Sequence, residues 1–363
     1  MSSPATPVLP PSLSAKLTAL AKQPARSDAP HALDEILAEL ANLSAHSIVR
    51  ASREIATSAY LGWWQPEKRP MQIVPSHGAL PFPLARLRSL HGLERVPSDT
   101  ELLAANPNFA WLFLFHPSGY IREAALETIV TPPTSAFFFA ALAWRLNDWV
   151  RPVRQAAERC AARVLHRTTA EVTANAALYL LDRRLVWGRW ADEATALDRA
   201  FERRDVIEDL TVQLQELSTG PLATCLRHAL RYPNIDAHLP RLATTAVQPS
   251  VRAVAYGCLI SGEATWPVGL EWMWIDKVYG LRKRIPKLAR RNIERVRPAA
   301  EFIREAARDK SPLVRRVAAD ALIAARSQLP DEEALIARMA QDRSSAIRSR
   351  ADFMLRHPPS ERS

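Results

Sequence analysis

The residues best suited to chemistry in this sequence form a dense basic run between Lys277 and Arg297. Nine lysines and arginines stand there against one acid, Glu294, so the run carries +8 of the net +10 of the whole chain. Like charges at this density repel one another, and an anionic partner would relieve that repulsion. A solvated surface is the competing interpretation of any charge run. The candidate binding residues are Arg282, Lys283, Arg284, Lys287, Arg290, Arg291 and Arg295.

Tryptophan is the second unusual feature, with ten residues in the chain. One interpretation is packing between helices, because tryptophan buries a large apolar area. The other is a binding face, since tryptophan and arginine are enriched among the residues that dominate interfaces. Trp187 and Trp190 are the candidate aromatic contacts with a partner, because Gly188 marks a turn between them and both rings cannot easily enter one core.

The common catalytic and metal-binding motifs are missing from the sequence. It has no Cys-x-x-Cys, no His-Glu-x-x-His, no glycine-rich phosphate loop and no Gly-x-Ser-x-Gly. Its nine histidines are scattered, and none is followed by glutamate. We therefore predict no metal site, no cofactor and no catalytic residue, and the sequence favours a protein that is not an enzyme.

A short sequence motif, the recurring phrase, supplies the helices that must position these side chains. It consists of a turn residue, a β-branched residue followed by arginine, and small residues one helical turn later. It is clearest from Asp309 to Ala325, where Asp309 and Ser311 suit a helix N-cap and Pro312 suits a first turn. Apolar and small residues then recur at helical spacing along one face. We expect another helix to approach that thin face closely, and we expect Val153, Ala157, Val251, Ala255, Val314 and Ala318 to be buried in such seams.

The arginine of this phrase measures the length of one unit. It recurs after 32 residues from Arg122 to Arg154 and after 33 residues from Arg315 to Arg348. The 63 residues from Arg252 to Arg315 are interpreted as two such steps. A helical unit that recurs at a fixed spacing and cannot bury its apolar face alone predicts stacked repeats.

The phrase resembles that of the HEAT-repeat family, in which an Asp/Pro turn is followed by Val-Arg at the start of the second helix. The resemblance implies an all-α fold, a right-handed α-solenoid of stacked helical hairpins. In that family the turn aspartate and the second-helix arginine commonly form a hydrogen-bonded ladder between neighbouring repeats. Carried over to this chain, the ladder positions pair Asp148 with Arg154, Asp309 with Arg315, and Asp342 with Arg348.

Composition divides the chain into four parts. Residues 1–27 form an arm that is disordered or partly helical, and residues 357–363 form a disordered tail. Residues 28–110 form an N-terminal helical region with a proline-rich irregular insertion at 61–97. Residues 111–356 form the repeat solenoid.

Two local patterns give sharper expectations. Ser98 and Glu101 make a capping box that opens a helix. From Pro286 onward the basic run is predicted to be a helix, with Lys287, Arg290, Arg291 and Arg295 on one face. The opposite face would carry Leu288, Ala289, Ile293 and Val296.

The leading functional hypothesis is a non-catalytic scaffold or adaptor that binds a protein partner, an acidic one included, on a concave face. The alternative is nucleic-acid binding through the basic segment 277–297, with a general resemblance to the HEAT-like alkylpurine DNA glycosylases in ingredients such as Asp148 and Trp187. We expect no membrane partner, because the longest apolar runs are shorter than the ~18 residues that span a bilayer. Three cysteines within helical patterns suggest buried thiols in a reducing compartment, so the predicted location is the cytoplasm.

Overall fold

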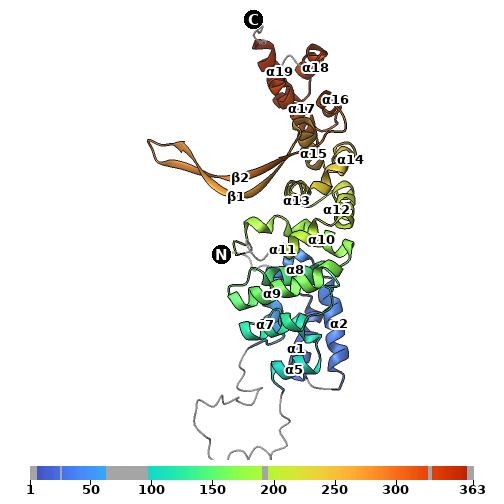
Figure 1. Ribbon diagram of the computed structural model, residues 1–363, viewed down its shortest axis with the longest axis vertical. Helices are drawn as coiled ribbons and strands as arrows, with labels where there is room; N and C mark the ends of the chain where they lie inside the picture. Colours follow the sequence, from blue (N-terminus) through green and yellow to red (C-terminus); the bar gives the residue numbers. More distant parts are fainter. Residues whose placement is uncertain (1–5, 25–26, 63–96, 190–194, 326–328, 358–363) are drawn as a thin grey trace, which may run out of the picture. The chain divides into compact units, whose positions relative to one another are not determined.

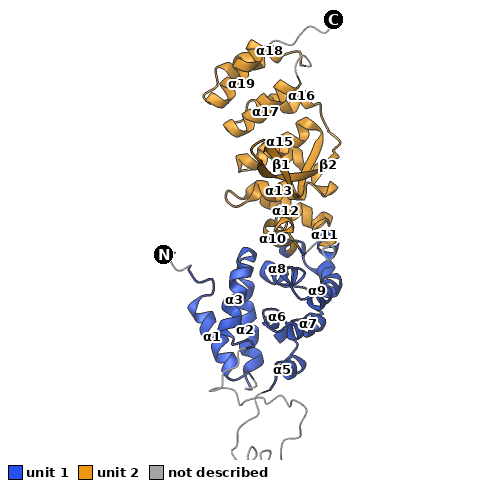
Figure 2. Cartoon of the chain, turned by 90° about the vertical axis from the view of Figure 1, so that its left-hand side faces the viewer, with its two compact units in different colours: residues 1–172, 189–198 blue, residues 173–188, 199–363 orange. Residues whose placement is uncertain are grey.

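A computed structural model describes residues 6–24, 27–62, 97–189, 195–325 and 329–357. The described chain is mostly helical and carries one two-stranded sheet (Figure 1). It divides into two compact units, residues 1–172 with 189–198 and residues 173–188 with 199–363 (Figure 2). The predicted insertion at 61–97 lies almost wholly outside the described residues, as do Trp190, residues 1–5 of the arm and residues 358–363 of the tail.

The first unit is built from short helices around an aromatic core. Phe113, Phe137 and Phe139 are among its largest fully buried side chains. The predicted capping box is confirmed. The Ser98 hydroxyl accepts a hydrogen bond from the Glu101 amide, and the Glu101 carboxylate accepts one from the Ser98 amide. The elements are α1 (Pro11–Lys22), α2 (Ala29–Ala41), η1 (Ala45–Ser47), α3 (Ile48–Ser58), α5 (Asp99–Ala105), α6 (Phe109–Phe113), α7 (Gly119–Thr128), α8 (Ala136–Arg145), α9 (Arg151–Val164) and η2 (Leu165–Arg167).

The second unit continues the helical pattern and contains the sheet. Helices α10 (Ala170–Leu180) and α11 (Thr195–Phe201) each begin in the first unit and end in the second. The remaining elements are η3 (Arg183–Leu185), α12 (Arg204–Glu216), α13 (Leu222–Ala229), η4 (Pro233–His238), α14 (Leu239–Thr245), α15 (Pro249–Ser261), β1 (Glu263–Asp276), β2 (Leu281–Asn292), α16 (Ala299–Ala306), α17 (Pro312–Ala324), α18 (Glu332–Ala340) and α19 (Ser345–Arg356).

Helices of the second unit pack in pairs, and the second helix of each pair contacts the second helix of the following pair. Helix α14 lies on α15, α16 on α17 and α18 on α19, while α15 contacts α17 and α17 contacts α19. The small residues of the recurring phrase allow this close approach. All six residues predicted to lie in seams are fully buried, which confirms that prediction: Val153, Ala157, Val251, Ala255, Val314 and Ala318.

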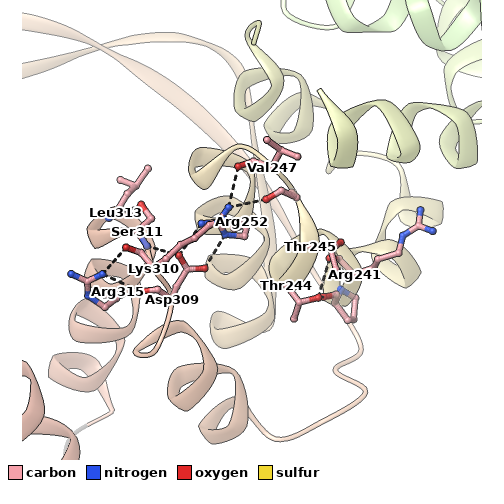
Figure 3. Close-up of polar contacts among 12 residues, drawn as sticks. Arg241, Thr244, Thr245, Val247, Arg252, Asp309, Lys310, Ser311, Leu313 and Arg315 are labelled. Atoms are coloured by element: carbon pink, nitrogen blue, oxygen red, sulfur yellow. Dashed lines mark hydrogen bonds and ion pairs between the residues drawn. The ribbon is translucent and has the colours of Figure 1, made fainter. Parts of the chain in front are cut away.

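Arginines near the start of α15 and α17 tie one pair to the next through turn aspartates. Arg252 donates from Nε and Nη2 to the carboxylate of Asp309, each at 2.8 Å, while its Nη1 donates to the carbonyls of Ala246 and Val247 (Figure 3). Arg315 repeats the arrangement, binding the carboxylate of Asp342 at 2.6 and 2.8 Å and the carbonyl of Asp309 at 2.9 Å. Two-point pairing between a planar guanidinium and a carboxylate fixes orientation as well as distance.

The first unit contains the same arrangement, more deeply buried. Arg122 binds the Asp148 carboxylate at 2.9 and 2.8 Å, and Arg145 adds a third contact at 2.7 Å. Arg154 and Arg348 donate to the backbone carbonyls of Asp148 and Asp342 respectively. Arg122 and Arg252 were not among the ladder positions carried over from the family, although both stand at the arginine of the recurring phrase.

Two sequence interpretations are wrong, and one element explains both. The basic run does not form a helix from Pro286; residues 281–292 are strand β2, paired antiparallel with β1. Between Arg252 and Arg315 there is one pair, α16 and α17, and a β-hairpin, so the 63-residue interval is not two repeats. The fold is therefore mainly α with a hairpin.

The physical reason for the hairpin lies in the partner strand. Residues 263–276 contain three tryptophans together with Thr265, Val268 and Ile275, and these residue types favour strands. Gly280, at φ 65°, supplies the left-handed backbone that the turn requires. Pro267 and Pro286 are tolerated because both strands of a two-stranded ribbon are edges.

The three cysteines are buried and form no disulfide, as the sequence predicts. Burial raises the pKa of Cys160 and of Cys258 to about 12, and it raises that of Cys225 as well. These thiols are therefore protonated and unreactive near neutral pH.

Candidate nucleic-acid interface

The hairpin of β1 and β2 extends away from the helices of the second unit (Figure 1). Its base is fixed: Ala264 is fully buried, Ile293 is almost so, and the Ile293 amide donates to the Gly262 carbonyl at 2.9 Å. From Val268 to Leu288 most side chains of both strands are exposed. The outer part of the hairpin, residues 268–288, is the candidate site.

Arg291 and Arg295, both predicted to bind a partner, lie at the base of the hairpin. The guanidinium of Arg291 binds the Asp236 carboxylate through two contacts of 2.6 Å and donates to the carbonyls of Leu230 and Tyr232. Arg295 lies against Gly262, where an added Cβ would meet the guanidinium at 2.5 Å. Arg291 therefore anchors the hairpin to the helices, whereas the Arg295 side chain remains exposed.

The other predicted basic residues divide between the two faces of the ribbon. Residues directly opposite in an antiparallel pair share a face, and successive residues alternate. Trp272 is opposite Arg284 and Trp274 is opposite Arg282, so these four form one face, the tryptophan–arginine face. The other face, the lysine face, carries the remaining cations of the outer strand, Lys283 opposite Met273 and Lys287 opposite Gly269.

The tryptophan–arginine face is ordered by cation–π contacts. The guanidinium carbon of Arg282 lies 4.4 Å from the ring centroid of Trp272 and 5.9 Å from that of Trp274. The guanidinium carbon of Arg284 lies 5.4 Å from the Trp272 centroid. Such contacts hold a cation in place while leaving its N–H groups available to an acceptor.

The two strands differ sharply in composition. Strand β2 has six basic residues and no acid, whereas β1 has none of the basic residues and many apolar ones. The acids of the hairpin are Glu263, Glu271 and Asp276, and the Asp276 carboxylate accepts the amides of Val278 and Tyr279 in the turn. Exposed apolar side chains of the outer hairpin are Val268, Leu270, Trp272, Met273, Trp274, Ile275, Val278, Tyr279, Leu281 and Leu288.

Exposure on this scale indicates an interaction surface. A two-stranded hairpin is at best marginally stable alone in water. Contiguous exposed apolar surface marks binding sites in proteins. Trp272 and Trp274 are each about half exposed, and the turn residues Val278 and Tyr279 more so. A solvated charged face would not need these side chains between its cations.

Of the two tryptophans predicted to contact a partner, Trp190 lies outside the described residues and Trp187 is not part of the hairpin. Trp187 is buried and packs edge-on against Tyr179, and the guanidinium carbon of Arg183 lies 4.4 Å from the Tyr179 ring centroid. Sequence reasoning missed Trp272 and Trp274 as site residues. Their two-residue spacing, opposite an alternating basic strand, was the signal that could have found them.

Asp148, an ingredient of the glycosylase resemblance, is engaged in packing. Its side chain is 1% exposed and accepts from Arg122, Arg145 and the Val150 amide. Within the described parts of the chain, no three His, Cys, Asp or Glu residues gather where they could hold a metal ion. None of the described helices combines the length and the apolar character needed to cross a bilayer.

Comparison with protein-family models, with curated proteins and with solved structures gives no significant match. The hairpin is therefore the feature of this chain that points to a function.

Proposed function

We propose that the protein binds nucleic acid through the outer part of the β1–β2 hairpin. The observation that carries the proposal is the strand β2, whose basic residues face no acid on their own strand and stand beside exposed tryptophans. Lysine and arginine neutralise phosphates, and aromatic side chains contact bases. This combination is the electrostatic and chemical footprint expected of a nucleic-acid-binding element.

The helical part would act as the frame that presents the hairpin. We propose that it is a right-handed α-solenoid of HEAT-like hairpins, as the recurring phrase suggests. The paired helices of the second unit and the arginine–aspartate contacts between successive pairs support this. A frame of stacked units tolerates an insertion between two helices, because each unit contacts only its neighbours.

The direct test is fluorescence anisotropy with labelled duplex and single strands at ~0.15 M salt, near physiological screening. A quadruple variant, Arg282→Gln, Lys283→Gln, Arg284→Gln and Lys287→Gln, should lose binding. The matched control removes four exposed arginines elsewhere in the second unit: Arg227→Gln, Arg308→Gln, Arg316→Gln and Arg343→Gln. If both variants weaken binding equally, net charge and not the hairpin is responsible.

A scaffold that binds an acidic protein is the second candidate function. The exposed apolar side chains of β1 and of the turn favour it, since such surface also marks protein interfaces. The absence of binding to any nucleic acid at tens of micromolar would overturn the first proposal. Retention of the wild-type protein, but not the quadruple variant, on an immobilised acidic polypeptide would then support the second.

A further inference from the structure

We infer, resting on the nucleic-acid binding proposed above, that the ligand is a B-form DNA duplex entered through its major groove. In this arrangement β1 faces the floor of the groove and β2 runs between the two phosphate backbones. Three observations carry it: cations on both faces of the ribbon, the confinement of the basic residues to one strand, and the dimensions of the ribbon.

The cations of the outer hairpin point to an anionic partner with two walls. Arg282 and Arg284 lie on one face of β2, and Lys283 and Lys287 on the other. All four side chains are exposed. A flat surface, such as a membrane or the side of another protein, would neutralise one of these faces. The walls of a DNA groove present phosphates to both.

The division between the strands sets the orientation within the groove. Phosphates line the rims of the major groove, whereas the floor presents base edges, including the methyl groups of thymine. Strand β2 supplies all the basic residues of the two strands, and β1 supplies most of their exposed apolar residues, among them Leu270 and Met273. The basic strand therefore matches the rims and the apolar strand the floor.

The size of the ribbon selects the groove and the kind of duplex. Two strands lie about 4.8 Å apart, and with side chains on both faces a ribbon is about 10 Å thick. The major groove of B-DNA is about 12 Å wide and 8.5 Å deep, and it admits such a ribbon, whereas the minor groove is about 6 Å wide. The major groove of A-form RNA is deep and too narrow for side chains to read.

The decisive experiment compares two double variants on opposite faces, each losing two charges. Arg282→Gln with Arg284→Gln alters the tryptophan–arginine face, and Lys283→Gln with Lys287→Gln alters the lysine face. Binding of a labelled duplex of about 20 base pairs, two helical turns, is measured against salt. Each pair should reduce the log–log salt slope by about 1.8, at about 0.9 per phosphate.

If only one of the two double variants reduces the salt slope, the two-walled arrangement is overturned. Far-ultraviolet circular dichroism verifies that each variant is folded. Because Arg282 and Arg284 contact tryptophans, a second version with lysine at both positions should restore the slope. Failure of that version to do so would also overturn the inference, since the charge would then not be what matters.

A ligand panel separates this inference from the broader proposal. Duplex DNA should bind about tenfold more tightly than duplex RNA or single-stranded DNA of the same sequence. Guanine N7 should be protected from dimethyl sulfate, and a minor-groove ligand such as distamycin should not compete. Equal or tighter binding of single strands or duplex RNA, or competition by distamycin, would overturn this inference and leave nucleic-acid binding intact. Loss of all binding would overturn both.

Discussion

Arg252 and Asp309 are joined by two hydrogen bonds of 2.8 Å although 57 positions separate them in the sequence. The equivalent pair Arg315 and Asp342 is separated by 27. The difference is 30, the number of residues from the start of β1 to the end of β2. The hairpin is thus a complete insertion between α15 and α16, and the contact between helical pairs closes around it unchanged.

The first prediction concerns that contact. Asp309→Ala should lower the free energy of unfolding by about 2–4 kcal/mol, because it leaves the guanidinium of Arg252, 3% exposed, without its carboxylate. Urea denaturation measures the loss. Asp320→Ala is the control, since the Asp320–Arg350 pair is more exposed and should contribute at most about 1 kcal/mol. Nucleic-acid affinity at a temperature where both are folded should not change; a selective loss would place Asp309 in the binding site.

A second prediction concerns the two aspartates of the same arginine–aspartate contacts, Asp309 and Asp342. The hydrogen bond from Arg315 lowers the pKa of Asp342 below its ordinary value of 3.8. Burial raises the pKa of Asp309, but hydrogen bonds from Arg252 and the Ser311 amide outweigh that effect and lower it overall. A depressed pKa contributes stability above the ordinary value, and this stability is lost as the pH falls through the folded-state pKa.

Urea midpoints of the wild type should therefore decline between about pH 5 and about pH 2. The variants Asp309→Asn and Asp342→Asn should show a shallower decline, because neither amide titrates. Parallel curves for wild type and variants would show that other carboxylates control acid unfolding.

The third prediction separates the base of the hairpin from its binding surface. Arg291→Gln should destabilise the protein, because Asp236 and two backbone carbonyls lose their donor. It should leave the salt dependence of DNA binding unchanged at temperatures where the variant is folded. Lys287→Gln should do the reverse, leaving the urea midpoint unchanged and flattening the salt slope by about 0.9. The same outcome for both variants would contradict the assignment.

The fourth prediction concerns the tryptophan–arginine face. Trp272→Ala should weaken DNA binding about two- to fivefold, since the two arginines lose a cation–π contact of about 0.5–1 kcal/mol at an exposed site. The salt slope should stay constant because no charge is removed. Trp149→Ala, which removes an exposed tryptophan of the first unit, is the matched control and should bind as wild type. A changed slope would mean that Trp272 does more than orient its arginines.

The fifth prediction uses the whole insertion. The Gly262 carbonyl and Ile293 amide lie 2.9 Å apart, so residues 263–292 can be replaced by a short glycine linker. Circular dichroism should show the helices intact, and binding to nucleic acid should be lost. Asp309→Ala should destabilise this shortened protein about as much as the full chain. Loss of helix on deletion would show instead that the hairpin is part of the fold.

The helical framework could be predicted from the sequence because its signals are local. Caps, small residues at helical spacing and the repeated arginine all act within one or two turns, so Ser98, Val314 and Ala318 lie where they were expected. The phrase indicated Asp309, Arg315 and Asp342 but not their partners, because Arg315 binds the carboxylate of Asp342 and only the backbone carbonyl of Asp309.

The hairpin could not be predicted in the same way, because strand pairing is a relation between distant residues. Lys287, Arg290 and Arg291 are spaced as on one face of a helix, and this local pattern by itself predicts a helix. Their strand conformation depends on residues 263–276, and irregularities after Pro267 and Trp274 interrupt the strict alternation that would have marked β1. The 30-residue insertion also makes the interval from Arg252 to Arg315 nearly twice the length of one repeat. The interval therefore resembles two repeats, although it contains one helical pair and the hairpin.

The burial of all three cysteines has a practical consequence. Their thiols are shielded and remain protonated, so maleimides should modify the native protein very slowly. A cysteine introduced for Val278, the most exposed apolar residue of the hairpin turn, would then be the single readily labelled position. A dye attached there would report the approach of the hairpin to a labelled DNA by energy transfer, without removal of any native residue from the core.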